Sequence, residues 1–218
     1  MIPLLHDLSG ATVLVLGGGP VGARKARRFS REARTVVVSP AFCEADFGDA
    51  ELVRDAPDAE GVYEWIDRLE PALVVCATDS ERINEAATAA ARERGTLVNR
   101  ADRSGERESG GVVVPATVRE DPVVVAIATG GTAPALSKHL RERLETELEG
   151  AGAMAELLSE LRTELRETGH PPERRRAAVG AVVESSAVWK ALRTGESKRP
   201  DVADDVIESA LETEGDDG

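Results

Sequence analysis

The sequence predicts an α/β protein whose amino-terminal half forms a parallel sheet and whose carboxyl-terminal half is helical. Over roughly the first 100 residues, short apolar runs alternate with helical patterns, as in successive β-α-β units. A glycine-rich stretch joins the first apolar run to the first helical pattern. Beyond Gly150 the chain carries helical patterns alone. These three observations indicate one sheet domain followed by a helical region.

The sheet strands are expected to be short, apolar and buried on both faces. A helix between the first two strands, at 21–32, carries several basic residues. A longer helix at 80–94 begins at Ser80, a suitable cap, and ends before Gly95. The segment 61–64 has only a weak pattern. The predicted strands are residues 12–16, 35–38, 52–54, 73–77 and 96–99.

A polar, glycine-rich segment, 103–111, is expected to be a loop. After it, the apolar pieces 112–114, 117–119 and 123–128 predict strands outside the first sheet, with a turn at Asp121-Pro122. Thr132 is a natural cap and Pro134 suits the first turn of a helix that runs to about 149. Gly150 and Gly152 suggest a hinge. Further helices are predicted at 153–168, 172–192 and 201–211, and an acidic disordered tail at 212–218.

The chain is strongly acidic, with a formal net charge of −13. This charge argues against binding to nucleic acids or to anionic membranes, which both attract basic surfaces. Only four of its 27 basic residues are lysine. Abundant carboxylates with few lysines are typical of proteins from salt-loving organisms, although an ordinary acidic cytosolic protein remains the alternative.

Cysteine and histidine usage argues against a metal site. Cys43 and Cys76 are too few for a disulfide framework, and Cys76 lies in an apolar run. The three histidines, His6, His139 and His170, have no spacing typical of metal ligands. No apolar run reaches the ~18 residues of a membrane span, and the start of the chain does not resemble a signal peptide. We therefore expect a cytoplasmic protein.

The stretch Gly17–Gly22 satisfies the pattern G-x-G-x-x-G, with an apolar strand before it and a helix after it. In that setting Gly17 permits a tight turn, Gly19 lets the backbone approach a pyrophosphate, and Gly22 lets helix and strand pack closely. The helix amino terminus offers free N–H groups to phosphates. The sequence thus predicts a Rossmann-type domain that binds a nicotinamide dinucleotide, with a ligand-free glycine turn as the alternative.

The end of the second strand does not decide between NAD and NADP. An acidic residue often stands there to bind the adenosine ribose. Here Ser39, Pro40 and Ala41 occupy the position, without a carboxylate. Ser39 is able to hydrogen-bond a ribose hydroxyl, but the usual discrimination against a 2′-phosphate is missing.

Several separate motifs resemble the precorrin-2 dehydrogenase part of siroheme synthases. They are VLVLGGGPVGARKAR at 13–27, VVCATDSERIN at 74–84, Val98-Asn99 followed by Asp102, and VAIATGGTAPALSKHLRERLE at 125–145. The resemblance covers residue 3 to about 165. It implies NAD-dependent oxidation of precorrin-2 to sirohydrochlorin in siroheme biosynthesis. In some members it also implies insertion of ferrous iron, where Fe2+ is a substrate.

The resemblance also implies an organisation and a set of site residues. It implies a Rossmann domain at 1–114, a dimerisation region at 115–149 and a helical region at 150–211, assembled as a homodimer. Asp102 matches the family's general acid or base, a role that suits reactions releasing protons; a solvated loop carboxylate is the alternative. The glycine motif and the resemblance together give as cofactor residues Gly17, Gly19, Pro20, Val21, Gly22, Ser39, Pro40, Ala41 and Thr78. The tetrapyrrole residues are Thr129 and Gly130, with Arg24 added because arginine pairs well with carboxylates.

Two of these assignments have plain structural alternatives. Thr129 is equally well explained as a turn residue, and Arg24, with Lys25 and Arg27, as part of a solvated helix face. The sequence also departs from the family at Arg100 and Ala101, and in the longer loop that follows Asp102. A different function for the whole chain would be an NAD-sensing regulatory module without catalysis, which explains the glycine loop but not TGGTAP.

Overall fold

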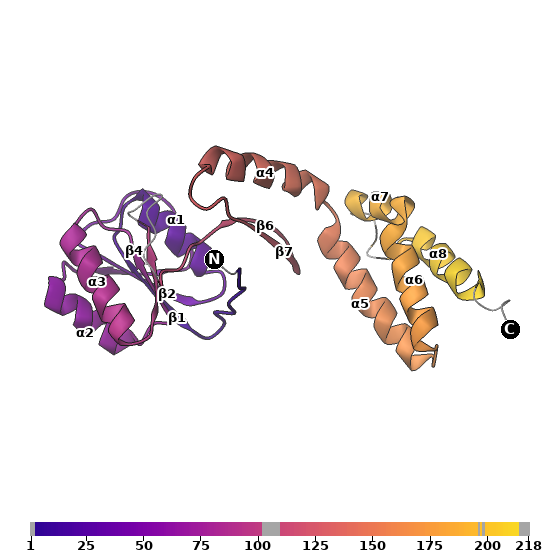
Figure 1. The fold of residues 1–218 in the computed structure, drawn as a ribbon, viewed down its shortest axis with the longest axis horizontal. Coiled ribbons are helices and arrows are strands. Elements are labelled where there is room, and N and C mark those ends of the chain that lie inside the picture. Colours follow the sequence, from indigo (N-terminus) through magenta and orange to yellow (C-terminus); the bar gives the residue numbers. More distant parts are fainter. Residues whose placement is uncertain (1–2, 102–109, 196, 198, 214–218) are drawn as a thin grey trace. The chain divides into compact units, whose positions relative to one another are not determined.

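A computed structural model describes residues 3–101, 110–195, 197 and 199–213. The chain divides into two compact units, Met1–Val114 and Pro115–Gly218, drawn in indigo to magenta and in brown to yellow in Figure 1. The first unit holds the predicted parallel sheet and the second holds most of the helices. The α/β fold class predicted from the sequence is therefore confirmed.

The first unit is built on a five-stranded parallel sheet of order β3-β2-β1-β4-β5. Helices make every connection between successive strands except that from β2 to β3, which is a loop, and the strand order reverses between β1 and β4. Ligands bind at such a switch point, beyond the carboxyl ends of the strands. The elements are β1 (Thr12–Leu16), α1 (Pro20–Phe29), β2 (Arg34–Ser39), β3 (Glu51–Arg54), α2 (Ala59–Leu69), β4 (Leu73–Cys76), α3 (Glu81–Glu93) and β5 (Leu97–Arg100).

Alternate side chains of the strands fill two cores, one on each face of the sheet. Leu14 and Leu16 face one core, where α2 and α3 cover the sheet with residues such as Trp65. Val13 and Val15 face the other, where α1 covers it. Figure 1 shows α2 and α3 side by side on the sheet. This double covering explains why every strand of the sheet except the edge strand β3 is largely buried.

Two sequence-based expectations for this unit were wrong or incomplete. The weak segment 61–64 lies inside the helix α2, which begins at its cap Asp58 with a bond from the Gly61 N–H to Asp58 Oδ1 of 2.9 Å. The segment 112–114 is no strand. It is nevertheless held against β5, because the Val112 N–H donates to the Val98 carbonyl over 2.8 Å.

The second unit begins with the antiparallel hairpin of β6 (Ala116–Glu120) and β7 (Val123–Ile127) and the helix α4 (Pro134–Glu147). Asp121 and Pro122 form the turn of the hairpin, as predicted. Thr132 was expected to cap α4, but the cap position is Ala133. The Thr132 hydroxyl instead donates to the Thr129 carbonyl, 2.7 Å away.

Four helices complete the second unit: α5 (Ala151–Glu167), α6 (Pro172–Glu184), α7 (Ser186–Thr194) and α8 (Asp201–Thr213). Their shared core includes Leu157 and Leu161, which are almost fully buried. Gly152 lies inside α5 and is not a hinge. Glycine is needed there because a Cβ would collide with the Asp121 carbonyl. Among the helices that the structure describes, none has the length and apolar character needed to cross a membrane.

Candidate functional site

A cleft of about 790 Å³ lies at the carboxyl edge of the sheet in the first unit. It is formed by the loops that follow β1, β2 and β4, on both sides of the strand-order reversal. Its size suits a cofactor or small ligand. The residues that line it are Leu16, Gly17, Gly18, Gly19, Pro20, Val21, Val38, Ser39, Pro40, Ala41, Ala56, Pro57, Ala77, Thr78, Asp79, Ser80, Glu81, Ile83, Asn84 and Ala101.

The glycine loop forms the floor of the cleft between β1 and α1. Gly17 has a φ of +115°, which side chains disfavour, and a Cβ there would collide with the Ala77 carbonyl. A Cβ on Gly22 would collide with the Gly17 carbonyl. At Gly19, by contrast, a Cβ would meet no atom within 4 Å. The loop is therefore closely packed beneath Gly17 and Gly22 and open at Gly19, on the cleft side.

The helix α1 directs its amino terminus into this cleft. Gly19 is its cap residue, and Pro20 and Val21 are its first residues and line the cleft. N–H groups in the first turn of a helix have no intrahelical acceptor, and they carry the positive end of the helix dipole. The N–H groups of Val21 and Gly22 are thus placed to bind the phosphates of a dinucleotide.

The loop after β2 is fixed by a hydrogen bond from its own serine. Ser39 is buried, and its Oγ donates to the Ala41 carbonyl over 2.8 Å. A Cβ on Gly18 would collide with that same carbonyl, so the two loops pack tightly. Because the Ser39 hydrogen is used within the loop, its Oγ is left to accept from a ligand hydroxyl.

The loop after β4 is held by Asn84, whose role the sequence did not reveal. Asn84 is buried on α3; its Nδ2 donates to the Thr78 carbonyl over 2.9 Å and its Oδ1 accepts from the Thr78 hydroxyl over 2.8 Å. Thr78 lines the cleft, so Asn84 fixes part of its wall. The stretch ATDSERIN places Thr78 and Asn84 six residues apart, but only the turn into α3 shows that they meet.

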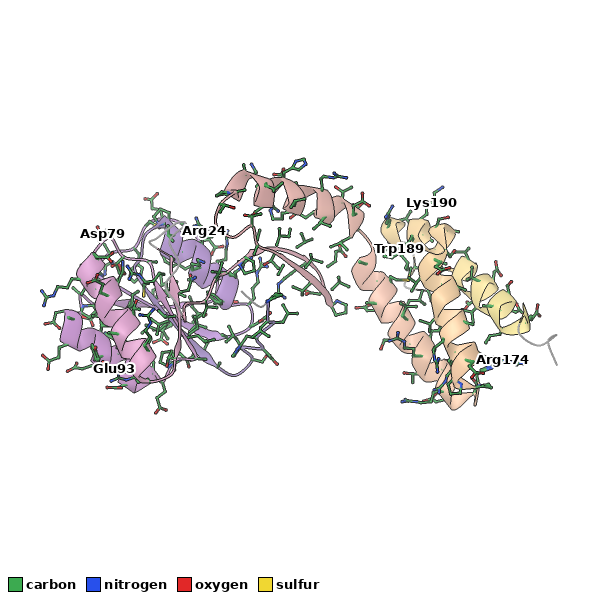
Figure 2. The ribbon with its side chains drawn as sticks, in the orientation of Figure 1. Arg24, Asp79, Glu93, Arg174, Trp189 and Lys190 are labelled. Atoms are coloured by element: carbon green, nitrogen blue, oxygen red, sulfur yellow. The ribbon has the colours of Figure 1, made fainter. Side chains whose placement is uncertain are left out.

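The charged residues lining the cleft are acidic. They are Asp79, which lies before α3 in Figure 2, and Glu81, the first residue of α3. Glu81 receives two bonds from Arg100 Nη2, of 2.9 and 3.0 Å. Among the described residues that line the cleft there is no Lys or Arg. The phosphate-binding capacity of the cleft therefore comes from backbone N–H groups rather than from side-chain cations.

Asp102, predicted to be catalytic, lies outside the described residues, but the described segments on either side of it are hydrogen-bonded to strands of the sheet. Ala101 lines the cleft, and its N–H donates to the Cys76 carbonyl over 2.9 Å. On the far side of the loop, the Val112 carbonyl accepts from Asn99 Nδ2 over 2.7 Å. The described residues on the two sides of 102–109 are therefore held at β4 and β5, and Ala101 lies at the wall of the cleft.

The remaining predicted residues fall into two places. Arg24 is exposed on α1, where Figure 2 labels it. Thr129 and Gly130 lie in the second unit, in the turn between β7 and α4. There the Thr129 hydroxyl lies 2.8 Å from the Ser137 hydroxyl and 3.1 Å from the Ala133 carbonyl, so it has a structural role at the start of α4. No group of three His, Cys, Asp or Glu side chains suited to a metal occurs in the described part of the chain.

The chain is similar to a family of NAD(P)-binding domains and to proteins named precorrin-2 dehydrogenase and siroheme synthase. Residues 4–116 match the family described as "Putative NAD(P)-binding". A precorrin-2 dehydrogenase of Methanosarcina barkeri is 32% identical over 226 residues, covering 96% of this chain and 95% of that protein. A siroheme synthase of Stutzerimonas stutzeri is 33% identical over 207 residues, covering 91% of this chain but 43% of that longer protein.

Among solved structures, the chain is similar to that of SirC, a precorrin-2 dehydrogenase. The likeness has a TM-score of 0.66 at 22% identity and covers 89% of this chain and 98% of that one. At 22% identity, the likeness establishes the fold alone. Because it covers 89% of this chain, it includes both the sheet unit and the helical unit.

Proposed function

Because the chain belongs to the precorrin-2 dehydrogenase family, we propose that it oxidises precorrin-2 to sirohydrochlorin with NAD. The observation that carries the proposal is the cleft at the strand-order reversal, where a closely packed glycine loop is open at Gly19 alone and the amino terminus of α1 faces the opening. An NAD-sensing module without catalysis remains the alternative, and turnover distinguishes the two.

The size of the cleft and the backbone N–H groups at its edge support the binding of a dinucleotide. Gly17, Gly19, Val21 and Gly22 supply a phosphate cradle, and the loops at Ser39–Ala41 and Thr78 form its walls. When bound there, NAD supplies a hydride acceptor. Among the described residues that line the cleft there is no cation to pair with a 2′-phosphate, which favours NAD over NADP.

This chain's part in the reaction is to orient the substrate and to accept protons. Dehydrogenation transfers a hydride to the cofactor and releases a proton from the macrocycle. We assign the proton acceptor to Asp102, which directly follows the cleft-lining Ala101. Arg24 on α1, and Thr129 and Gly130 in the second unit, are the residues proposed to contact the tetrapyrrole; Arg suits its carboxylates.

The test follows turnover and cofactor binding separately. The pure protein is incubated with precorrin-2 and NAD at low and at high salt, and sirohydrochlorin is detected by its absorbance. Turnover at either salt concentration supports the proposal, and its absence at both while NAD still binds supports the sensing module. Asp102→Asn is expected to lower kcat at least a hundredfold, the scale of general acid-base catalysis, with NAD affinity unchanged. Full activity in that variant would remove Asp102 from the mechanism.

A second reaction, insertion of ferrous iron into sirohydrochlorin, is suggested by the similarity to siroheme synthases. Chelation releases pyrrole protons, so the same acceptor, Asp102, would serve both reactions. Ferrous iron is here a substrate and not a resident metal. Adding it to sirohydrochlorin with the protein under anaerobic conditions tests this reaction: siroheme formation that is no faster than without protein would exclude it.

We also propose that the enzyme is a cytoplasmic homodimer formed through the region 115–149. The helix α4 has no buried residue, and Leu136 on it is 49% exposed. An exposed leucine on a helix that covers only a two-stranded hairpin suggests a further partner. Neither cysteine forms a disulfide, which is compatible with a reducing compartment.

A further inference from the structure

The helix α1 is a basic element in an acidic chain. Its ten residues, PVGARKARRF, include Arg24, Lys25, Arg27 and Arg28 and no acid. The whole chain carries 40 acidic and 27 basic residues. A concentration of positive charge on the helix that enters the cofactor cleft therefore runs against the composition of the protein, and it creates a local field that attracts anions.

Lys25 lies one helical turn beyond a residue of the cleft. Gly19, Pro20 and Val21 line the cleft, and Lys25 follows Val21 by four residues on the same side of α1. Its Cα is thus about 6 Å further along the helix axis. Side chains on a helix lean toward its amino terminus, which for Lys25 is the end of α1 at the cleft.

Lys25 is partly buried and has no carboxylate partner in the part of the chain that is described. Asp46, an acid in contact with this helix, pairs with Arg27 over 3.8 Å. Burial, followed by repulsion from Arg28 and Arg24, lowers the pKa of Lys25 from 10.5 to about 8. An ammonium group that is desolvated without a partner costs stability, and an incoming anion would remove that cost.

We propose that Lys25 binds a peripheral carboxylate of the tetrapyrrole and so orients the macrocycle against the cofactor cleft. The inference rests on the proposed function, because precorrin-2 and sirohydrochlorin carry acetate and propionate groups around their rim. The other anion within reach is the cofactor pyrophosphate. That group is served by the N–H groups of the glycine loop, and Lys25 is not among the residues that line the cleft.

The first test measures two affinities in the same variants. Sirohydrochlorin and NAD are titrated separately into the wild type, Lys25→Met, Lys25→Arg and the control Lys190→Met, whose lysine is exposed on α7 (Figure 2). We expect Lys25→Met to weaken sirohydrochlorin binding at least tenfold, with NAD affinity changed less than twofold. Lys25→Arg should recover part of the loss, and Lys190→Met should match the wild type.

Two outcomes of this titration would overturn the inference. Unchanged sirohydrochlorin affinity in Lys25→Met would show that no carboxylate binds there. An equal loss of NAD and sirohydrochlorin affinity would assign Lys25 to the pyrophosphate or to the fold. If the wild type itself binds no sirohydrochlorin and turns over no precorrin-2, the proposed function fails as well. If it turns over precorrin-2 with Lys25→Met unaffected, only the present inference fails.

The second test measures proton uptake. At pH 8 about half of the Lys25 side chains are neutral, since the pKa is about 8, and a bound carboxylate favours the charged form. The charges that face this lysine are Arg24 and Arg28 on its own helix. In the strands beneath α1 the only charged residue is Arg34, which bonds to Glu51 over 3.0 Å.

Calorimetry of sirohydrochlorin binding in two buffers of different ionisation enthalpy should show proton uptake in the wild type and in Lys190→Met. The uptake should be absent in Lys25→Met; equal uptake in that variant would contradict the inference.

Discussion

Gly19 and Gly22 stand three residues apart in one loop, yet a methyl group is expected to have different consequences at the two positions. At Gly19 a Cβ meets no atom within 4 Å and the φ is −78°, so Gly19→Ala should leave thermal stability unchanged. Its methyl group would occupy the open side of the loop, where the phosphates approach, and NAD affinity should fall about tenfold or more.

Gly22→Ala provides the matched control for this prediction. Its Cβ would collide with the Gly17 carbonyl beneath α1, so both the unfolding temperature and NAD affinity should fall. Thermal unfolding and NAD titration of the two variants separate the effects. A Gly19→Ala variant that binds NAD as tightly as the wild type would place the pyrophosphate elsewhere.

Lys25 gives a pH-dependent prediction about stability. Its pKa is about 8 in the folded protein and 10.5 in the unfolded chain, so between these values the unfolded chain binds more protons. Stability therefore rises with pH through this window, and below pH 8 the buried charge imposes its full cost. Lys25→Met should be more stable than the wild type at pH 7, by roughly 1–2 kcal/mol after allowance for its partial exposure. Denaturant unfolding at pH 7 and pH 10 checks this, because the difference should shrink at pH 10; a variant that is less stable at pH 7 would contradict it.

At the scale of elements, the sequence predicted most of the first sheet because buried parallel strands are continuous apolar runs. It missed α2 because that helix covers the sheet with few residues, Val62, Trp65 and Ile66, among exposed polar ones. It assigned a strand to 112–114 because Val112 is apolar. In the structure that residue packs on the core next to α1 and bonds to β5 outside any regular strand. A segment that is held by one packed residue has no repeating apolar pattern, so its sequence does not predict its structure.

The helical pattern 172–192 was predicted to be one helix, but the structure divides it into α6 and α7 at Ser185. Ser185 has an extended backbone, and its Oγ accepts from the Val188 N–H over 3.3 Å, which caps α7. A serine inside an apolar period gives no sign of whether it caps a helix or faces solvent. The break allows Val182 and Val188, on the two helices, to enter the same core.

The cap at Ser185 leads to a prediction for this unit. Ser185→Ala should lower the free energy of unfolding by about 1 kcal/mol, because the first turn of α7 loses its side-chain acceptor. Chemical denaturation followed by circular dichroism measures the loss. Ser186→Ala, at an exposed position one residue further, is the control and should have little effect. Equal stability of Ser185→Ala and the wild type would show that the cap contributes nothing.

At the scale of the whole molecule, the candidate site could be predicted only in part from the sequence. Most of the residues predicted to bind the cofactor belong to one local motif and the neighbouring strand ends, and they line the same cleft in the structure. Asn84 escaped notice because its contact with Thr78 depends on how the chain turns into α3. Thr129 and Gly130 belong to a separate unit from the cleft, so their contact with the substrate stays a prediction.

Assembly is tested at the exposed side of α4. Leu136, Leu140 and Leu144 follow one another at intervals of four residues, so they share one side of the helix, and none of them is buried within the chain. If this side forms the homodimer interface, Leu136→Asp should place a charge in an apolar contact and yield a monomer, while folding is unaffected because Leu136 is 49% exposed. Light scattering after gel filtration gives the mass, and circular dichroism confirms the fold.

The control for this prediction is Glu147→Gln, at an exposed position near the end of α4, which should remain a dimer. A dimer that persists in Leu136→Asp would move the interface to another surface of the protein. A monomeric variant that has also lost turnover but retains NAD binding would show that the partner subunit completes the tetrapyrrole site.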